Sequence, residues 1–364
     1  MLPATSPRGI MPFAVGALIT FLVVYFNSFY PHFRLASQSS NSILPVPSRT
    51  YVISLPRRTD RRQEMERLRA LLDTHWTYVV AEDSESTLVA GLMAQVRSLR
   101  QNELRANGYL SIPNTTITLP FAWPAFTAPV EAMSSQEFLD PLPPVAIAPS
   151  SDSEPEQELP LTCATQNFTL TPYAPGIPEH KILSRSRIAC WRSHLSAIRR
   201  AAAPTPSRQA SLILEDDIDI EADIRAQLQS VWGLLPRDWD IVFLGHCWSN
   251  ESYHPALSLS PARVQATSTH LHPSRAPLCT HAYALSPAGA ARVLQHLAHP
   301  PYAYSRAIDH AFAWLVRSGR LKGFSVVPSV VVQRKIGASD VMRGTGSRWR
   351  ERLVDGVLAG AGAG

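Results

Sequence analysis

The chain has 364 residues, of which 45% are hydrophobic and 17% charged, and its formal net charge is +5. This length and apolar content are enough for one large core or two modest ones. The sequence shows no basic run with interleaved aromatic residues, so it argues against a nucleic acid as partner. The basic charge fits an anionic small substrate or a membrane surface.

An uncharged apolar stretch at residues 10–30 is long enough to span a bilayer, and its aromatic far end is typical of a membrane interface. A cleaved signal peptide is the alternative, but Phe33 to Ala36 gives no clean small-x-small cleavage site. The sequence therefore predicts a short cytoplasmic tail at 1–9, a transmembrane signal anchor at 10–30 and a stem at 31–48.

Three N-glycosylation sequons lie downstream of this anchor, beginning at Asn114, Asn167 and Asn250. Such tripeptides are acceptors only in the secretory pathway, so their position favours a domain that faces the lumen. We therefore expect a single-pass type II protein.

The four cysteines are scattered along the chain, without a CxxC motif and without a nearby pair of histidines: Cys163, Cys190, Cys247 and Cys279. This spacing argues against a zinc module. In an oxidising lumen one or two disulfides are possible, and buried free thiols are the alternative.

The folded domain is predicted at 49–342 and opens with a strand, a helix and a strand. Tyr51 to Leu55 forms the first strand, and Trp76 to Val80 forms the second. The helix between them follows Thr59 and Asp60, and Asp60 with Gln63 is expected to form a capping box.

A long insertion is predicted at about 83–178, because Pro-rich and acidic segments there lack any periodicity of a core. It contains one helical pattern near Leu88 to Leu104, and the rest is expected to be partly disordered. A basic, Gly-rich tail is predicted at 343–364.

Strands and helices alternate in the remainder of the domain, which predicts an α/β fold with a mostly parallel sheet. The expected elements are a helix from Ser184 to Pro204, a strand at Ser211 to Leu214, a helix at Ala222 to Leu235, a strand at Trp239 to Leu244, a strand at Thr280 to Leu285, helices at Pro287 to Leu297 and Ser305 to Ser318, and a last pair of strands at Gly323 to Val327 and Val330 to Gln333.

Three adjacent acids, Glu215, Asp216 and Asp217, follow the apolar run Ser211 to Leu214. Ligands of open α/β sheets bind where strands end, and adjacent carboxylates repel unless a cation or solvent relieves them. An EF-hand loop is excluded, because Ala222 and Leu228 stand where it needs Gly and Glu. A divalent cation held by one or two carboxylates and by phosphate oxygens of a ligand fits, with solvated acids at a strand end as the alternative.

Ordered segments covering about half of the chain resemble glycosyltransferase family 25, which contains collagen β-galactosyltransferases and bacterial lipooligosaccharide galactosyltransferases. The matching segments are Tyr51 to Arg62, Ile188 to Leu195, Leu212 to Asp217, Trp239 to Gly245, Thr280 to Ala290, Ala307 to His310 and Gln333 to Asp340. Ser186 and Arg187 depart from the family's usual Gly-Glu, and Ala189 from its usual Gly.

The resemblance implies a GT-A fold and a metal-dependent inverting transferase. It would move a hexose, most often galactose, from a UDP-sugar to a glycan or glycoprotein acceptor, with manganese as the usual cation. We therefore expect a protein of the Golgi or endoplasmic reticulum membrane. The alternative is a catalytically silent, membrane-anchored carbohydrate-binding or scaffold protein with the same fold.

Site residues follow from matching the family's segments to this chain. Glu215, Asp216 and Asp217 are the expected metal ligands, with Asp217 the first choice, and Asp309 is the expected base. The expected donor-binding residues are Arg58, Asp60, Arg61, Ser193, His194 and Tyr283. Alternatives remain open at several of them: Asp309 suits the N-terminus of a helix, Ser193 and His194 suit a core helix, and Tyr283 suits core packing.

Overall fold

The computed structural model describes residues 42–109, 115–123, 159–204, 209–258, 268–334 and 352–360. The elements in the first half of the chain are β1 (Ser48–Ser54), α2 (Thr59–Leu71), β2 (Thr77–Val80), α3 (Thr87–Ala106), β3 (Ile117–Thr118), β4 (Thr169–Leu170), the 3-10 helix η4 (Glu179–Lys181) and α4 (Arg185–Ala202). The second half contains β5 (Ala210–Glu215), β6 (Ile218–Ile220), α5 (Ile224–Val231), η5 (Trp232–Leu234), β7 (Ile241–Phe243), β8 (His270–Pro273), β9 (Ala282–Leu285), α7 (Pro287–Ala298), α8 (Ile308–Arg317), β10 (Gly323–Val327), β11 (Val331–Gln333) and α9 (Val357–Gly360).

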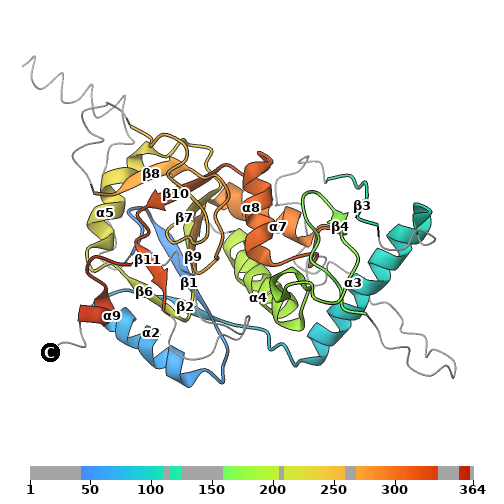
Figure 1. Cartoon of the computed structure of the whole chain (residues 1–364). Coiled ribbons are helices and arrows are strands. Elements are labelled where there is room, and N and C mark those ends of the chain that lie inside the picture. Colours follow the sequence, from blue (N-terminus) through green and yellow to red (C-terminus); the bar gives the residue numbers. More distant parts are fainter. Residues whose placement is uncertain are drawn as a thin grey trace, which may run out of the picture. The chain divides into compact units, whose positions relative to one another are not determined.

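A seven-stranded mixed sheet in the order β2-β1-β5-β9-β7-β10-β8 forms the centre of the domain (Figure 1). Strands β2, β1, β5, β7 and β10 share one direction, whereas β9 and β8 run opposite to them. The predicted α/β class with a mostly parallel sheet is therefore confirmed. Strand β9 separates β5 from β7, so two parallel groups of strands meet through one antiparallel strand.

Apolar side chains cover both faces of this sheet, because residues that alternate along each strand point to opposite faces. In β5, Ile213 belongs to the core on the α4 side, whereas Leu212 and Leu214 belong to the core on the α2 side. Helices α3, α4, α7 and α8 contribute to the first core, and α2, α5 and α9 contribute to the second. The domain therefore has three layers, with the sheet in the middle.

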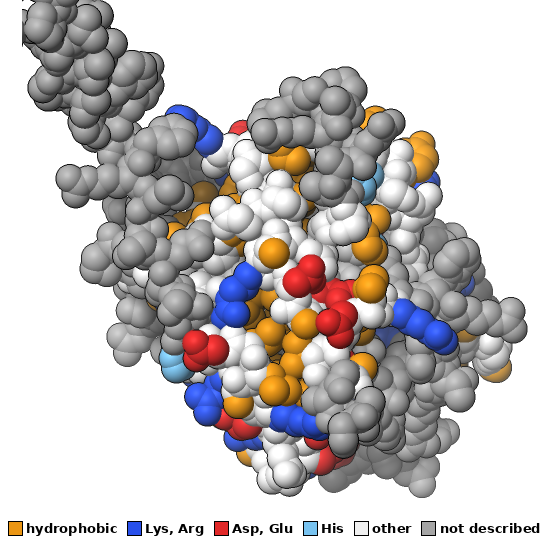
Figure 2. All heavy atoms as spheres, turned by 90° about the vertical axis from the view of Figure 1, so that its left-hand side faces the viewer, with side chains coloured by type: hydrophobic (Ala, Val, Ile, Leu, Met, Phe, Trp, Pro, Cys, Tyr) orange, Lys and Arg blue, Asp and Glu red, His pale blue; other side chains and the backbone are white. Residues whose placement is uncertain are grey.

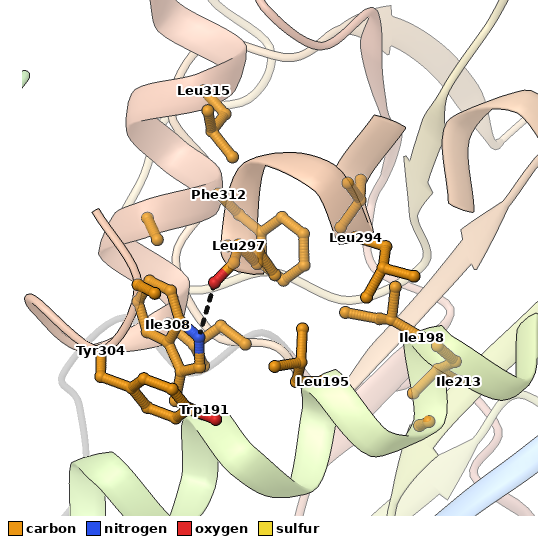
Figure 3. Packing of buried hydrophobic residues seen from close by; sticks show 14 of the residues in the cluster. Trp191, Leu195, Ile198, Ile213, Leu294, Leu297, Tyr304, Ile308, Phe312 and Leu315 are labelled. Atoms are coloured by element: carbon orange, nitrogen blue, oxygen red, sulfur yellow. Dashed lines mark hydrogen bonds between the residues drawn. The ribbon is translucent and has the colours of Figure 1, made fainter. Parts of the chain in front are cut away.

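Helix α4 packs at the centre of the first core (Figure 3). Figure 3 shows Trp191, Leu195 and Ile198 of α4 pointing toward side chains of α7 and α8. Trp191 is fully buried, and its indole Nε1 donates a hydrogen bond to the Leu297 carbonyl oxygen at 3.3 Å. The buried face of α4 that was predicted from the spacing of these residues is confirmed. Packing of this face against α7 and α8 holds α4 against the sheet.

The predicted strands and helices are present with shifted ends, but several details differ. The helix expected over 222–235 is shorter, since α5 ends at Val231 and a 3-10 turn follows. The last two strands do not pair with each other: β10 pairs with β7 and β8, whereas β11 leaves the central sheet and pairs with β6. Strands β3, β4, β6 and β8 had no predicted counterpart.

The expected capping box at the start of α2 is wrong. Helix α2 begins at Thr59, so Asp60 lies within its first turn, and no side chain caps the helix. The Asp60 carboxylate instead accepts hydrogen bonds from the Arg58 guanidinium at 2.9 and 3.1 Å. The neighbouring cation thus competes with the backbone N–H groups for the carboxylate that the capping pattern requires.

The predicted tail at 1–9, the anchor at 10–30 and most of the stem lie outside the described residues. Within the described part of the chain, no helix is long and apolar enough to cross a membrane. Ile43 and Leu44, which were expected in the stem, are buried in the core on the α2 side. In the predicted insertion, α3 packs on the α4 side of the sheet, and residues 110–114 and 124–158 lie outside the described ranges.

The C-terminal residues 352–360 dock on β6, next to the strand that carries the three acids. The buried carboxylate of Glu221 accepts hydrogen bonds from the backbone N–H groups of Val354 and Asp355 at 2.6 and 2.9 Å. The buried carboxylate of Asp219 accepts one from Leu358 at 3.0 Å. These buried acids are satisfied by backbone donors and hold the segment in place.

Figure 2 shows the face that lies on the left-hand side of Figure 1, where α5 and α9 are found. On the described part of this face, acidic and basic side chains are interspersed with apolar ones, and they form no continuous basic stripe. Among the described residues of this face, the basic side chains are therefore not gathered into a single patch.

Candidate functional site

A pocket lined by both apolar and polar side chains opens at the carboxyl ends of the parallel strands β1, β2 and β5, above the first turns of α4. Its volume is about 610 Å³ when the open mouth is included. The strand ends contribute Ser54 from β1, Glu82 from the segment after β2, and Glu215 from β5. The position of this pocket is the one at which open α/β sheets bind ligands.

Helix α4 and the loop after β1 complete the walls of this pocket. The helix supplies Ser186, Cys190, Ser193 and His194, and the loop supplies Arg57 together with Arg61 from the first turn of α2. Five predicted site residues therefore line the pocket, namely Arg61, Ser193, His194, Glu215 and Asp216. Sequence reasoning did not find Ser54, Arg57, Glu82, Ser84, Ser186 and Cys190 as lining residues.

Glu215 is held by a chain of polar side chains that leads into the core. Its Oε1 lies 3.3 Å from His194 Nε2 and accepts a hydrogen bond from the Thr280 hydroxyl at 2.9 Å. His194 Nδ1 in turn lies 3.0 Å from the hydroxyl of Tyr283, which is fully buried. Burial opposes the ionisation of Glu215, but the His194 ring and Thr280 outweigh it and hold the pKa of Glu215 below its ordinary value.

Tyr283 therefore lies beneath the pocket rather than in its wall. Burial raises the pKa of Tyr283 well above its ordinary value, so its hydroxyl keeps its proton. Because it contacts His194 and packs on Phe243 and Phe312, Tyr283 can orient the His194 ring. Its burial agrees with the core packing that the sequence left open as an alternative to direct contact with the donor.

Asp216 and Asp217 share one arginine. Arg61 Nη1 lies 3.0 Å from Asp216 Oδ1 and 3.2 Å from Asp217 Oδ2. Burial raises the pKa of Asp216, against the lowering effect of Ser54 and Arg61. Burial, together with the charges of Glu215 and Asp216, raises the pKa of Asp217 to about 7.

The Asp217 carboxylate is only partly satisfied. Its Oδ2 accepts a hydrogen bond from Gln333 Nε2 at 3.1 Å, whereas its Oδ1 is buried and has no hydrogen-bond partner among the described residues. The backbone N–H of Arg334 donates to the Asp217 carbonyl oxygen at 2.6 Å, which ties the residue to the end of β11. A buried carboxylate oxygen without a partner is costly unless a ligand satisfies it.

A divalent cation fits this donor set. Ions such as Mg²⁺ and Mn²⁺ prefer oxygen ligands and are usually held by one or two carboxylates together with phosphate oxygens. Asp217 Oδ1 is buried without a hydrogen-bond partner among the described residues, and Asp216, the preceding residue, lines the pocket, whereas Asp217 does not. Over the described ranges, no group of three or more His, Cys, Asp or Glu side chains is placed to hold a metal ion. Two carboxylates are thus the contribution that the described residues can make.

Arg58 and Asp60 are not brought into the pocket. They form an ion pair at 2.9 Å, in which the Asp60 side chain is 65% exposed. The hydrogen bond from Arg58 lowers the pKa of Asp60 to about 2, so this carboxylate stays ionised and paired on the surface. Of the three predicted residues after the first strand, only Arg61 lines the pocket.

Asp309 lies in the first turn of α8 and does not line the pocket. Its Oδ2 accepts a hydrogen bond from the backbone N–H of Cys279 at 3.4 Å, and its Oδ1 accepts one from His310 at 2.8 Å. The residue after Cys279 is Thr280, whose hydroxyl binds Glu215. A single short segment therefore connects Asp309 to the acid at the end of β5.

The same segment is cross-linked by a disulfide between Cys247 and Cys279, whose Cα atoms are 5.7 Å apart. Cys163 and Cys190 are free. The sequence left open whether one or two disulfides form, and the structure contains one among the described residues. This bond joins the loop after β7 to the segment that contacts Asp309 and Glu215.

Ser193 connects α4 to the end of β2. Its hydroxyl accepts a hydrogen bond from the backbone N–H of Glu82 at 2.8 Å and donates one to the Ala189 carbonyl oxygen at 2.7 Å. Both hydrogen-bonding capacities of the hydroxyl are used, which makes Ser193 a support of the pocket wall. The Ser-His pair in α4 thus fixes the pocket at two points, through Glu82 and through Glu215.

In comparisons with known proteins, no protein-family model matches the chain, and no curated protein matches it.

Proposed function

We propose that this domain is a metal-dependent glycosyltransferase that moves a hexose, galactose first among them, from a UDP-sugar to a glycan or glycoprotein acceptor. The observation that carries the proposal is the pocket at the carboxyl ends of β1, β2 and β5, where Glu215 and Asp216 meet Arg61 and His194. The segments that resemble glycosyltransferase family 25 contain these four residues, and the mixed α/β sheet is compatible with the GT-A fold that the resemblance implies.

Two arginines in the wall of the pocket support a diphosphate ligand, with a cation to offset the carboxylates of Glu82, Glu215 and Asp216. Arg61 and Arg57 offer guanidinium groups that suit phosphate oxygens. When a cation is bound by Asp217 and Asp216, it would neutralise charge on the leaving diphosphate. Arg61 stands beside both carboxylates and can hold the phosphates while balancing the acids.

His194 and Glu215 suit a role in orienting the donor. Glu215 stays ionised because of its His194 and Thr280 contacts, and its side chain is 24% exposed, so it can accept hydrogen bonds from sugar hydroxyls. The series of contacts from Tyr283 through His194 to Glu215 restricts the rotamer of the Glu215 side chain.

Asp309 remains the proposed base that takes the proton from the acceptor hydroxyl. Replacement by asparagine keeps one side-chain oxygen, which can accept from the N–H of His310 or of Cys279, and removes the basic carboxylate. We expect Asp309→Asn to lower kcat for transfer by about 10²- to 10⁴-fold, with little change in the KM for the UDP-sugar. UDP release should be followed in the presence of glycan and glycopeptide acceptors, with manganese.

Replacement of the exposed neighbour, His310→Ala, is the matched control and should keep the activity of the native protein. If Asp309→Asn transfers at the native rate, Asp309 is an acid at a helix N-terminus and another group is the base. If the native protein binds sugars tightly without any turnover, the catalytically silent carbohydrate-binding or scaffold protein is the better description.

A further inference from the structure

Two of the three N-glycosylation sequons, at Asn167 and Asn250, lie within the described residues and have different surroundings. The third, at Asn114, lies outside the described residues. Asn167 is half-buried, and its Oδ1 accepts a hydrogen bond from Trp123 Nε1 at 2.7 Å. Thr169, the hydroxyl residue of this sequon, is buried in β4, where its Oγ1 lies 2.8 Å from Thr118 Oγ1. Side chains of this sequon are thus engaged within the fold, so the folded domain makes Asn167 a poorly accessible acceptor.

Asn250 lies in the exposed segment that follows β7 and has the opposite surroundings. Its side chain is exposed, and its Oδ1 accepts a hydrogen bond from Ser252 Oγ at 2.8 Å. The amide nitrogen Nδ2, to which an N-linked glycan is attached, makes no hydrogen bond among the described residues. The acceptor nitrogen is therefore accessible in the folded protein.

The middle residue of this sequon fixes the loop to the domain. Glu251 is 1% exposed, and its carboxylate accepts hydrogen bonds from the backbone N–H groups of Arg275 and Ala276 at 2.9 and 3.1 Å. The Ser325 hydroxyl of β10 donates a third at 2.9 Å. The backbone next to Asn250 is consequently held in place by the contacts of Glu251.

An exposed tryptophan stands two residues before Asn250. The Trp248 side chain is 55% exposed, although a ring of this size is normally mostly buried. Its φ of +57° lies in the left-handed region, which costs a tryptophan about 1–3 kcal/mol. The preceding Cys247 is joined to Cys279 by the disulfide and donates its backbone N–H to the Leu278 carbonyl oxygen at 2.9 Å.

A flat indole in this position suits the C–H face of a pyranose ring. Aromatic rings attract the polarised C–H groups of sugars and remove apolar surface from water. Because Trp248 and Asn250 are anchored on either side by Cys247 and Glu251, a sugar attached to Asn250 can stack on the Trp248 ring at low entropic cost.

We propose that Asn250 carries an N-linked glycan and that Trp248 supports the first N-acetylglucosamine of this glycan. In this modification the Asn250 Nδ2 loses a proton and forms a bond to C1 of the sugar. The C1–O bond to a lipid-linked diphosphate donor breaks, and the lipid diphosphate leaves. The Cys247–Cys279 disulfide places the loop in an oxidising compartment, in which this lipid-linked donor and its transferase also operate.

The test uses the full-length chain, expressed in secretory eukaryotic cells with a reporter sequon appended at its C-terminus. Peptide-N-glycosidase treatment and mass spectrometry of the peptides should show conversion of Asn250 to aspartate in the native chain. The conversion should be lost in Asn250→Gln and in Ser252→Ala, and it should persist in the control Asn167→Gln. A reporter sequon expressed without this chain serves as the control of the assay.

An unmodified Asn250 beside a modified reporter overturns the proposal, because the loop then fails as an acceptor. Loss of modification at both positions overturns it too, because the chain then does not meet the glycosylation machinery. For Trp248, the glycosylated native protein should have a higher Tm than its deglycosylated form. This difference should disappear in Trp248→Ala and return in Trp248→Phe. An unchanged difference in Trp248→Ala refutes the stacking contact.

Discussion

Replacing Asp217 with alanine is expected to lower manganese-dependent UDP release by about two to three orders of magnitude while the fold is kept. The carboxylate offers a buried Oδ1 that has no hydrogen-bond partner among the described residues, and Asp216 lies beside it. Alanine removes both oxygens that a cation would use, so the diphosphate would leave without that neutralisation.

The stability of this variant tests the same site independently of turnover. The raised pKa of Asp217, about 7, means that the folded state binds its proton more tightly than the unfolded chain. Between the ordinary value of 3.8 and about 7, the contribution of Asp217 to the stability of the native protein therefore falls as pH rises. Asp217→Ala lacks this penalty, so without metal its stability relative to the native protein should increase as pH is raised from about 5 to about 8.

Asp238→Ala is the matched control for both measurements. Asp238 is an exposed acid that pairs with Lys322 and precedes β7, at the amino ends of the parallel strands. It should keep both the UDP release and the pH dependence of the native protein. Equal UDP release by Asp217→Ala and the native protein would exclude Asp217 as a metal ligand, and a loss of stability at pH 8 would contradict the repulsion among the three acids.

Replacing Gly289 with alanine is expected to destabilise the domain by about 3 kcal/mol or more. Gly289 lies in the first turn of α7, which sits directly on the start of β7. A Cβ atom there would lie 2.0 Å from the Asp240 carbonyl oxygen and 2.6 Å from two other backbone atoms of that residue. The backbone of Asp240 cannot move freely, because its carbonyl oxygen also accepts a hydrogen bond from the Ser286 N–H at 3.1 Å.

Gly91→Ala is the control for this substitution. Gly91 lies inside α3, and a Cβ atom built there meets no heavy atom within 4 Å. Alanine is the better helix former, so this change should raise the stability by about 0.5–1 kcal/mol. Chemical denaturation of the two variants measures the difference. A Gly289→Ala variant as stable as the native protein would show that α7 does not seat this closely on β7.

Much of the fold was predictable because its elements carry strong local patterns. The apolar run Ser211 to Leu214 predicts a buried strand, and the spacing of Trp191, Leu195 and Ile198 predicts the buried face of α4. Strand direction was less accessible, since an alternation of apolar residues is the same for parallel and antiparallel neighbours. The antiparallel placement of β9 between β5 and β7 therefore appears only in the structure.

The candidate site was predictable to the extent that its residues belong to a recognisable motif. Glu215, Asp216 and Asp217 stand out as acids at a strand end, whereas Glu82 and Ser84 follow β2 without any local signal. The contact between His194 and Glu215 joins residues that are far apart in sequence, so the apolar periodicity of the helix favoured core packing of His194 slightly over ligand binding. The predicted capping box at Asp60 was wrong because the Arg58 guanidinium binds the Asp60 carboxylate. The spacing of residues in a capping pattern contains no information on such a competing cation.

The most direct measurement is calorimetric titration of the protein with UDP-galactose, first with manganese and then after chelation. Binding in the presence of manganese, weakened at least about tenfold by chelation, is the expected result, because a cation completed by phosphate oxygens would contribute to donor affinity. A panel of other UDP-hexoses in the same titration tests the choice of sugar. No binding of any UDP-hexose with manganese present would contradict the assignment of the pocket as a nucleotide-sugar site.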